Sequence, residues 1–179
     1  GIYMIDKDGY LTFVNEQLPK MLGYSKDDDI IGSHAFRFLK KDLIPLATER
    51  LEKRKEGISE SYDFTLVKKD GSFITAMLSS NPIFYEGVYQ GALVVVNDIT
   101  DRKIAEELLR ESEQMFATAF KGSPIAISIT SPIDGTIYDV NEVFLKDSGY
   151  TREELIGNTT LGLNFYSKES DRNFILSSI

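Results

Sequence analysis

Side chains that could perform chemistry are few in this sequence of 179 residues, and they are scattered along it. Asp27, Asp28 and Asp29 could suggest a metal site, but consecutive acids on a helix point in different directions and are typical of a solvated face. His34 is the only histidine, and a lone histidine is more often a cap or a surface residue than a ligand. The absence of cysteine excludes disulfides, thiolate nucleophiles and Cys-anchored haem or zinc. We therefore predict no catalytic residue and no metal site.

The charge balance and the length of the apolar runs exclude two classes of partner. The net charge is -8 at pH 7, whereas a nucleic-acid surface needs a basic face. The longest clean apolar run, residues 92–96, is far shorter than the roughly 20 residues of a membrane helix, so we expect no membrane contact by this chain. It opens on strand-like residues without an initiator Met. We expect a piece of a longer, cytoplasmic protein.

Four short motifs recur in the same order at an offset of about 126 residues. Each has a local role, because Asp-Gly favours a hairpin turn, Asn and Ser or Thr cap helices, and Gly ends them. Such an ordered recurrence indicates a duplicated domain. The matched pairs are Asp8-Gly9 with Asp134-Gly135, Val14-Asn15-Glu16 with Val140-Asn141-Glu142, Gly23-Tyr24-Ser25 with Gly149-Tyr150-Thr151, and Ile31-Gly32 with Ile156-Gly157.

The first copy predicts an α+β fold, in which a five-stranded antiparallel sheet carries a helical crossover on one face. The expected elements are a hairpin of strands 1–5 and 10–14, short helices over 15–39, a long helix over 42–56, and strands over 61–69, 73–84 and 89–96. On the long helix, Pro45 is tolerated in the first turn. Its buried face should hold Leu43, Leu46, Ala47 and Leu51, and residues 50–55 should form a solvated face.

The second copy is incomplete. Its hairpin is expected over 125–129 and 136–140, and its long helix begins at Ser167. The sequence stops before the last three strands, which would leave an apolar sheet edge exposed. The predicted domains are therefore 1–99, a connector over 100–122 and a truncated second domain over 123–179, and we expect the natural protein to continue.

The connector is the stretch around which the chain is organised. Thr100 is predicted as its N-cap, with a hydroxyl that accepts from a first-turn amide, and Asp101 suits the helix dipole. A coiled-coil seam and a helix docked on its own domains both fit this pattern. Two adjacent apolar stripes run along the helix: Ala105, Leu109, Ser112, Phe116 and Phe120, and Ile104, Leu108, Glu111 and Met115.

With these motifs the chain resembles tandem PAS domains of bacterial or archaeal signalling proteins. In addition to the repeated motifs, the resemblance rests on Lys69-Asp70-Gly71 and on Asp98-Ile99-Thr100-Asp101-Arg102-Lys103. The latter is similar to the Asp-Ile-Thr signature with which PAS domains lead into a downstream helix. The resemblance implies that Asp98, Thr100 and Arg102 form a signal relay, with an Arg–Asp pair as in many members. The alternative is that these residues only cap the helix.

The resemblance also implies a ligand pocket between the inner face of the sheet and the crossover. Its expected polar features are only the Tyr62 hydroxyl and Ser80, so a charged metabolite is not expected. A pocket filled by its own side chains is favoured, with a small apolar ligand as the alternative. The inward positions are Tyr62, Phe64, Leu66, Ile74, Ala76, Leu78, Ser80, Ala92, Val94 and Val96.

No cofactor is predicted by comparison with the family. Members that sense light through covalently bound flavin or pigment use a cysteine, and haem-binding members use a histidine on the long helix; the chain has neither. A non-covalent flavin stays open, although the tryptophan often used for it is missing.

The sequence predicts a sensory and relay module of a multidomain receptor, with a two-component sensor histidine kinase as the favoured output. One alternative is a ligand-free scaffold that forms a homodimer through the connector helix. The other is the sensor of a diguanylate cyclase or phosphodiesterase.

Overall fold

The computed structural model describes residues 1–25 and 30–166. The chain forms two compact units, residues Gly1–Glu107 and Leu108–Ile179. The aspartates at 27–29 and the long helix predicted from Ser167 lie outside the described residues.

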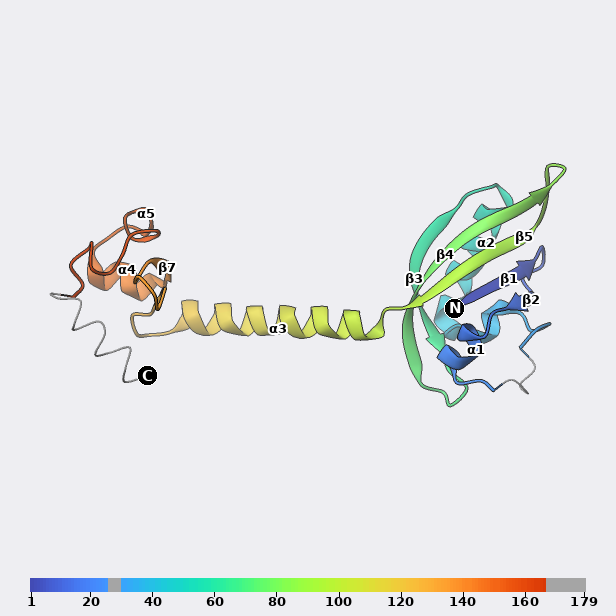
Figure 1. Cartoon of the computed structure of the whole chain (residues 1–179), viewed down its shortest axis with the longest axis horizontal. Coiled ribbons are helices and arrows are strands. Elements are labelled where there is room, and N and C mark those ends of the chain that lie inside the picture. The colour runs from blue at the N-terminus through green and yellow to red at the C-terminus, as the bar shows by residue number, and fades with distance from the viewer. Residues whose placement is uncertain (26–29, 167–179) are drawn as a thin grey trace. The chain divides into compact units, whose positions relative to one another are not determined.

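The first unit is built on a five-stranded antiparallel sheet with the order β2-β1-β5-β4-β3 (Figure 1). Side chains alternate along β3 and β4 between buried and more exposed positions, as the period of a strand requires. The predicted α+β class and five-stranded sheet are confirmed. The strands are β1 (Ile2–Asp6), β2 (Leu11–Val14), β3 (Glu60–Val67), β4 (Phe73–Tyr85) and β5 (Val88–Asp98).

One glycine controls how closely two strands of this sheet approach each other. Gly91 of β5 has φ of 147° and lies opposite Asp6 of β1. A Cβ atom at Gly91 would stand 1.9 Å from the carbonyl oxygen of Ile5. Only glycine therefore allows β1 and β5 to pair at this point.

The crossover between β2 and β3 consists of α1 (Gln17–Leu22), two short 3₁₀ helices, η1 (Ala35–Phe38) and η2 (Lys41–Leu43), and α2 (Ile44–Lys55). Pro45 lies in the first turn of α2, as predicted. The predicted buried face of this helix is wrong at two positions. Leu46 is 39% exposed, whereas Arg54, expected in solvent, is only 8% exposed.

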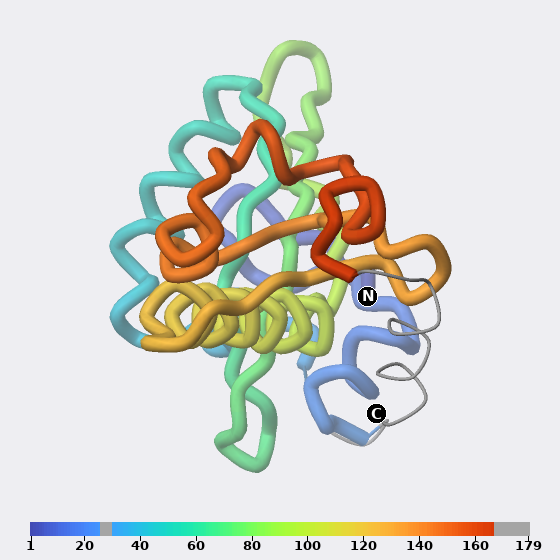
Figure 2. The backbone as a smooth tube through the Cα atoms, turned by 90° about the vertical axis from the view of Figure 1, so that its left-hand side faces the viewer, coloured from blue at the N-terminus to red at the C-terminus, as the bar shows by residue number. Residues whose placement is uncertain are grey.

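The connector α3 (Thr100–Gly122) is one uninterrupted helix (Figures 1 and 2). Phe120 near its end is buried. Five other large apolar side chains of the helix are more than half exposed: Ile104, Leu108, Leu109, Met115 and Phe116. Both a coiled-coil seam and a helix docked on its own domains stay open for this face.

The second unit holds β6 (Ser128–Thr130), β7 (Ile137–Val140), α4 (Glu142–Ser148) and α5 (Arg152–Leu155). β6 and β7 form a two-stranded antiparallel hairpin over a small core of Ile137, Val140 and Leu155. Thr151 and Glu154 form a capping box at the start of α5.

Two asparagines show that the repeat extends to individual hydrogen bonds. The Oδ1 atom of Asn15 accepts from the backbone of Ile2 and Leu18 at 2.9 and 3.2 Å. In the second unit, Asn141 Oδ1 accepts from Ile127 and Phe144 at 3.0 and 2.9 Å. Each asparagine thus joins the backbone at the start of its hairpin to the first turn of the helix that follows the hairpin, in line with the duplicated motif.

Candidate ligand pocket and helix junction

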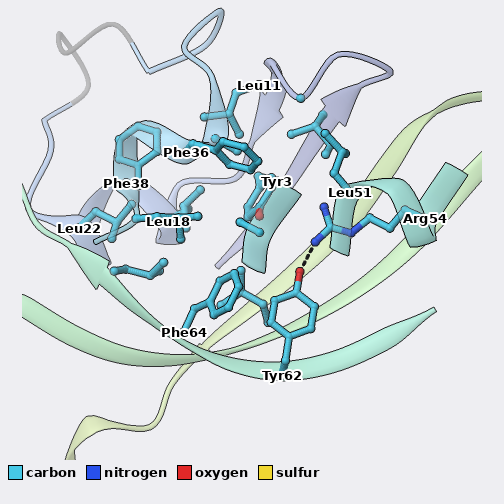
Figure 3. A pocket seen from close by; sticks show the side chains of 17 residues that line it. Tyr3, Leu11, Leu18, Leu22, Phe36, Phe38, Leu51, Arg54, Tyr62 and Phe64 are labelled. Carbon is cyan, nitrogen blue, oxygen red and sulfur yellow. Dashed lines mark hydrogen bonds between the residues drawn. The ribbon is translucent and has the colours of Figure 1, made fainter. Parts of the chain in front are cut away.

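A cavity of about 40 Å³ lies between the inner face of the sheet and the crossover in the first unit. Side chains therefore fill most of the space between these layers. Figure 3 shows the side chains around the cavity, which are mainly aliphatic and aromatic. They include Tyr3, Leu11, Leu18, Leu22, Phe36, Phe38, Leu51, Arg54, Tyr62 and Phe64.

The ten predicted pocket residues fall into two groups. All face inward and nine are fully buried, with Tyr62 half-buried. Four of them line the cavity: Tyr62, Phe64, Leu66 and Leu78. The other six form packed core beneath the middle of the sheet and do not border the cavity: Ile74, Ala76, Ser80, Ala92, Val94 and Val96.

The residues missed by sequence reasoning come from β1, β2 and the crossover. Tyr3 of β1, Leu18 of α1, Phe38 of η1 and Leu51 of α2 all border the cavity. Their apolar character was visible in the sequence. Their convergence depends on how the short helices fold back over the sheet, which the local pattern does not specify.

Arg54 is the charged group that the sequence analysis did not place in the pocket. It lies in the last turn of α2 and is 8% exposed. Its Nη2 donates a hydrogen bond to the Tyr62 hydroxyl, drawn as a dashed line in Figure 3. The helical period could have revealed it, because Arg54 follows the buried Ala47 and Leu51 at spacings of seven and three residues.

The tyrosines beside Arg54 do not neutralise its charge. Burial raises the pKa of Tyr62, and the positive charge of Arg54 offsets this effect only in part. Burial also raises the pKa of Tyr3 well above its usual range. Both phenols are therefore neutral near pH 7 and bring no negative charge to the guanidinium.

The junction between the sheet and α3 is a chain of short hydrogen bonds. The Asp98 carboxylate accepts from the backbone N–H of Thr100 at 2.9 Å and from its hydroxyl at 2.6 Å. The Thr100 hydroxyl in turn accepts from the N–H of Thr75 in β4 at 3.0 Å. Thr75 also accepts, through its carbonyl, from the N–H of Ile99 at 2.9 Å. The start of α3 is thus tied to β4.

This geometry corrects two expectations for the junction. Thr100 does not cap the helix through a first-turn amide, because its hydroxyl bonds to Asp98 and Thr75 instead. Arg102 does not pair with Asp98 among the described residues; its Nε lies 3.9 Å from the carboxylate of Glu106. A salt bridge that the sequence analysis missed joins the helix to the sheet, with Lys103 Nζ 3.0 Å from Asp63 Oδ2.

The family is decided by comparison with known proteins. A family model described as a PAS domain matches residues 1–101 and 124–175. This chain belongs to the PAS domain family. The predicted resemblance and its occurrence in two segments are thereby confirmed, and the match supports a sensory module rather than a catalytic domain.

Known relatives of these PAS domains include a kinase. Sporulation kinase A of Bacillus subtilis (strain 168) is 24% identical over 160 residues, which is 86% of this chain and 25% of the kinase. The chain therefore spans about a quarter of the length of this relative.

Solved PAS structures share the fold. The PAS domain of a protein from Colwellia psychrerythraea has a TM-score of 0.52 at 24% identity, covering 56% of this chain and 86% of that one. The PAS-B domain of Drosophila melanogaster Cycle, solved with bound ethylene glycol, has a TM-score of 0.50 at 12% identity, covering 54% and 97%. These similarities concern the fold alone, and each covers a little over half of this chain.

Other candidate features of the PAS domains have structural roles. His34 Nδ1 accepts from the N–H of Phe36 at 3.2 Å and caps η1, which is one of the two roles expected for this residue, a cap or a surface side chain. Over residues 1–25 and 30–166, no cluster of three or more His, Cys, Asp or Glu side chains could hold a metal ion. None of the helices in this part of the chain is both long and apolar enough to span a membrane.

Proposed function

We propose that this chain is a sensory and relay module of a larger receptor. In this proposal the first PAS domain adopts alternative states, and α3 passes its state to a downstream output domain. The observation that supports it most directly is the double hydrogen bonding of the Thr100 hydroxyl, to Asp98 and to Thr75 of β4.

The mechanism we infer is a shift of population between two sheet-to-helix arrangements. The first turn of α3 is bonded to β4, which also carries the pocket residue Leu78. On β3, Tyr62 faces the pocket while its neighbour Asp63 pairs with Lys103 of α3. A change in the pocket that shifts either strand would therefore displace the start of the helix. Residues 100–122 would act as the connector between domains 1–99 and 123–179.

The output domain we favour is a cytoplasmic histidine kinase of a two-component system. Support comes from the 24% identity to sporulation kinase A. In this proposal the chain itself is not catalytic, and the kinase activity belongs to the parent protein. A diguanylate cyclase or phosphodiesterase would be an alternative output, and the segment that follows residue 179 in the parent protein distinguishes these cases.

The relay is tested by Asp98→Ala in the intact receptor. The change removes the acceptor of two Thr100 hydrogen bonds, so the output activity should no longer respond to the state of the first PAS domain. Circular dichroism should show that the domain stays folded, because Asp98 is exposed at the end of β5.

Asp101→Ala is the matched control for this experiment. It removes the same charge from the same helix end, where Asp101 is exposed, but it leaves the bonds from Asp98 through Thr100 to Thr75 in place. If Asp98→Ala and Asp101→Ala receptors respond as the unmodified receptor does, the relay role is excluded.

A second candidate function is a ligand-free dimerisation scaffold. The exposed apolar face of α3 favours it, since an exposed row of large hydrophobic side chains is typical of a helix that pairs with another. The small volume of the cavity, about 40 Å³, is also consistent with a domain that binds no ligand.

A further inference from the structure

The cavity of the first PAS domain contains a buried cation, Arg54, for which the described part of the chain supplies no anionic partner. Within residues 1–25 and 30–166, no carboxylate lies within ion-pair distance of Arg54, and its Nε makes no hydrogen bond. One turn earlier on the same helix, Arg50 is paired with Glu60 at 2.5 Å. The two arginines differ in that Arg50 does not border the cavity and Arg54 does.

A buried guanidinium without a counter-charge is an unfavourable arrangement. Buried charges in proteins are normally paired and hydrogen-bonded, because removing them from water costs free energy. The Tyr62 hydroxyl satisfies one N–H group of Arg54 but supplies no negative charge. The unpaired guanidinium therefore favours the binding of an anion that carries at least one hydrogen-bond acceptor.

The planar shape of the Arg54 guanidinium indicates that the anion is a carboxylate. A guanidinium presents its N–H groups in a planar fork that matches the two oxygens of a carboxylate. Arg54 is the only charged side chain among the described residues that line the cavity, so a single negative charge is matched and a polyanion is not. The rest of the lining suits an apolar group, since it includes Leu11, Leu51 and Phe64.

The volume limits the ligand to very few atoms. The cavity of about 40 Å³ is well below the roughly 150 Å³ of a protein cavity that holds benzene. Only the shortest carboxylic acids fit such a space without rearrangement of the lining. Larger members of the class would require the lining side chains to move.

We propose that the cavity of the first PAS domain binds a short-chain monocarboxylate such as acetate, with its carboxylate on Arg54 and its apolar end against the leucine and phenylalanine side chains. This inference rests on the proposed sensory function and names the ligand class. It differs from the apolar ligand expected from the sequence because α2 directs Arg54 into the pocket.

The test is calorimetric titration of acetate into the complete 179-residue chain, with acetamide as the uncharged comparison. Acetate should bind saturably, and acetamide should not. Arg54→Met should weaken acetate binding about tenfold or more, because a charge-assisted hydrogen-bonded pair is lost. Lys55→Gln, which removes an exposed charge from the next residue, should change the affinity by less than about twofold.

A second variant separates binding from folding. Arg54→Met combined with Tyr62→Phe removes both members of the buried hydrogen bond, a change that is often close to neutral for stability. This chain should unfold at a temperature close to that of the unmodified chain and still fail to bind acetate.

The inference is overturned by either of two results. One is the absence of saturable acetate binding to the unmodified chain, and the other is equal binding by the folded Arg54→Met variant. Neither result bears on the relay, because the Asp98→Ala comparison measures receptor output and involves no added carboxylate. Conversely, if the chain binds acetate but the output of the Asp98→Ala receptor responds normally, the ligand proposal stands and the relay proposal is rejected.

Discussion

At the scale of single residues, the buried tyrosines of the pocket couple folding to alkaline pH. Tyr3 and Tyr62 both have pKa values raised above the usual 10.0 by burial. In the unfolded chain these phenols ionise near pH 10, whereas in the folded chain they remain protonated. Above that pH the folded state binds more protons than the unfolded state, so stability decreases as the pH rises.

Tyr3→Phe should reduce this alkaline loss of stability. Urea unfolding between neutral pH and pH 11 should give a free energy of unfolding that falls less steeply above pH 10 in Tyr3→Phe than in the unmodified chain. Tyr10→Phe is the control, because Tyr10 is 47% exposed. If Tyr3→Phe and the unmodified chain show the same slope, the raised pKa of Tyr3 makes no contribution.

Arginine and threonine can each serve in more than one structural environment, and the positions of Arg54 and Thr100 differ from those expected from their residue types. Arginine is usually exposed, so Arg54 was expected in solvent although the helical period places it on the buried face. Threonine can cap a helix or bond to a neighbouring strand, and Thr100 uses its hydroxyl for the strand. Both outcomes depend on which element lies opposite, and that information is not local in the sequence.

At the scale of elements, periodicity predicted most of the fold. The strands on which Phe64, Ile74 and Val94 lie were located within a few residues, because side chains alternate between a buried and an exposed face. The cavity was predicted less well. The cavity borders the crossover, whose helices are mostly too short to show a clear periodic pattern. Their positions therefore depend on the turns between them.

The exposed face of α3 predicts self-association of the chain. Leu108→Glu and Met115→Glu each place a charge in the row of side chains that two helices would bury together. Sedimentation velocity over a range of concentrations should show a dimer for the unmodified chain and a monomer for either variant. Glu113→Gln, a change at an exposed polar position on the same helix, should leave the dimer intact. A monomer at all concentrations for the unmodified chain would rule out the scaffold function for this chain.

At the scale of the whole molecule, α3 is held by side chains at both of its ends. Its first turn is bonded to β4 through Thr100. Near its last turn, the carbonyl of Phe120 accepts from Asn141 Nδ2 at 3.2 Å. Between these points the helix has no proline and no break.

In a continuous helix held at both ends, the number of residues sets the angle between the two ends as well as their separation. Each residue of an α-helix adds about 100° of rotation and 1.5 Å of length. Two residues inserted after Glu107 would turn one end by about 200° relative to the other, whereas seven residues would nearly restore the original angle while adding more length. In the intact receptor, the two-residue insertion should abolish the coupling of sensor and output, and the seven-residue insertion should preserve it.

If the seven-residue insertion instead reduced the coupling more than the two-residue insertion, the length of the connector and not its angle would determine the coupling. Under the proposed relay, α3 would carry the state of the first PAS domain as a torsion. Receptors that share this junction could then differ in connector length by whole heptads and still keep the sensor coupled to the output domain.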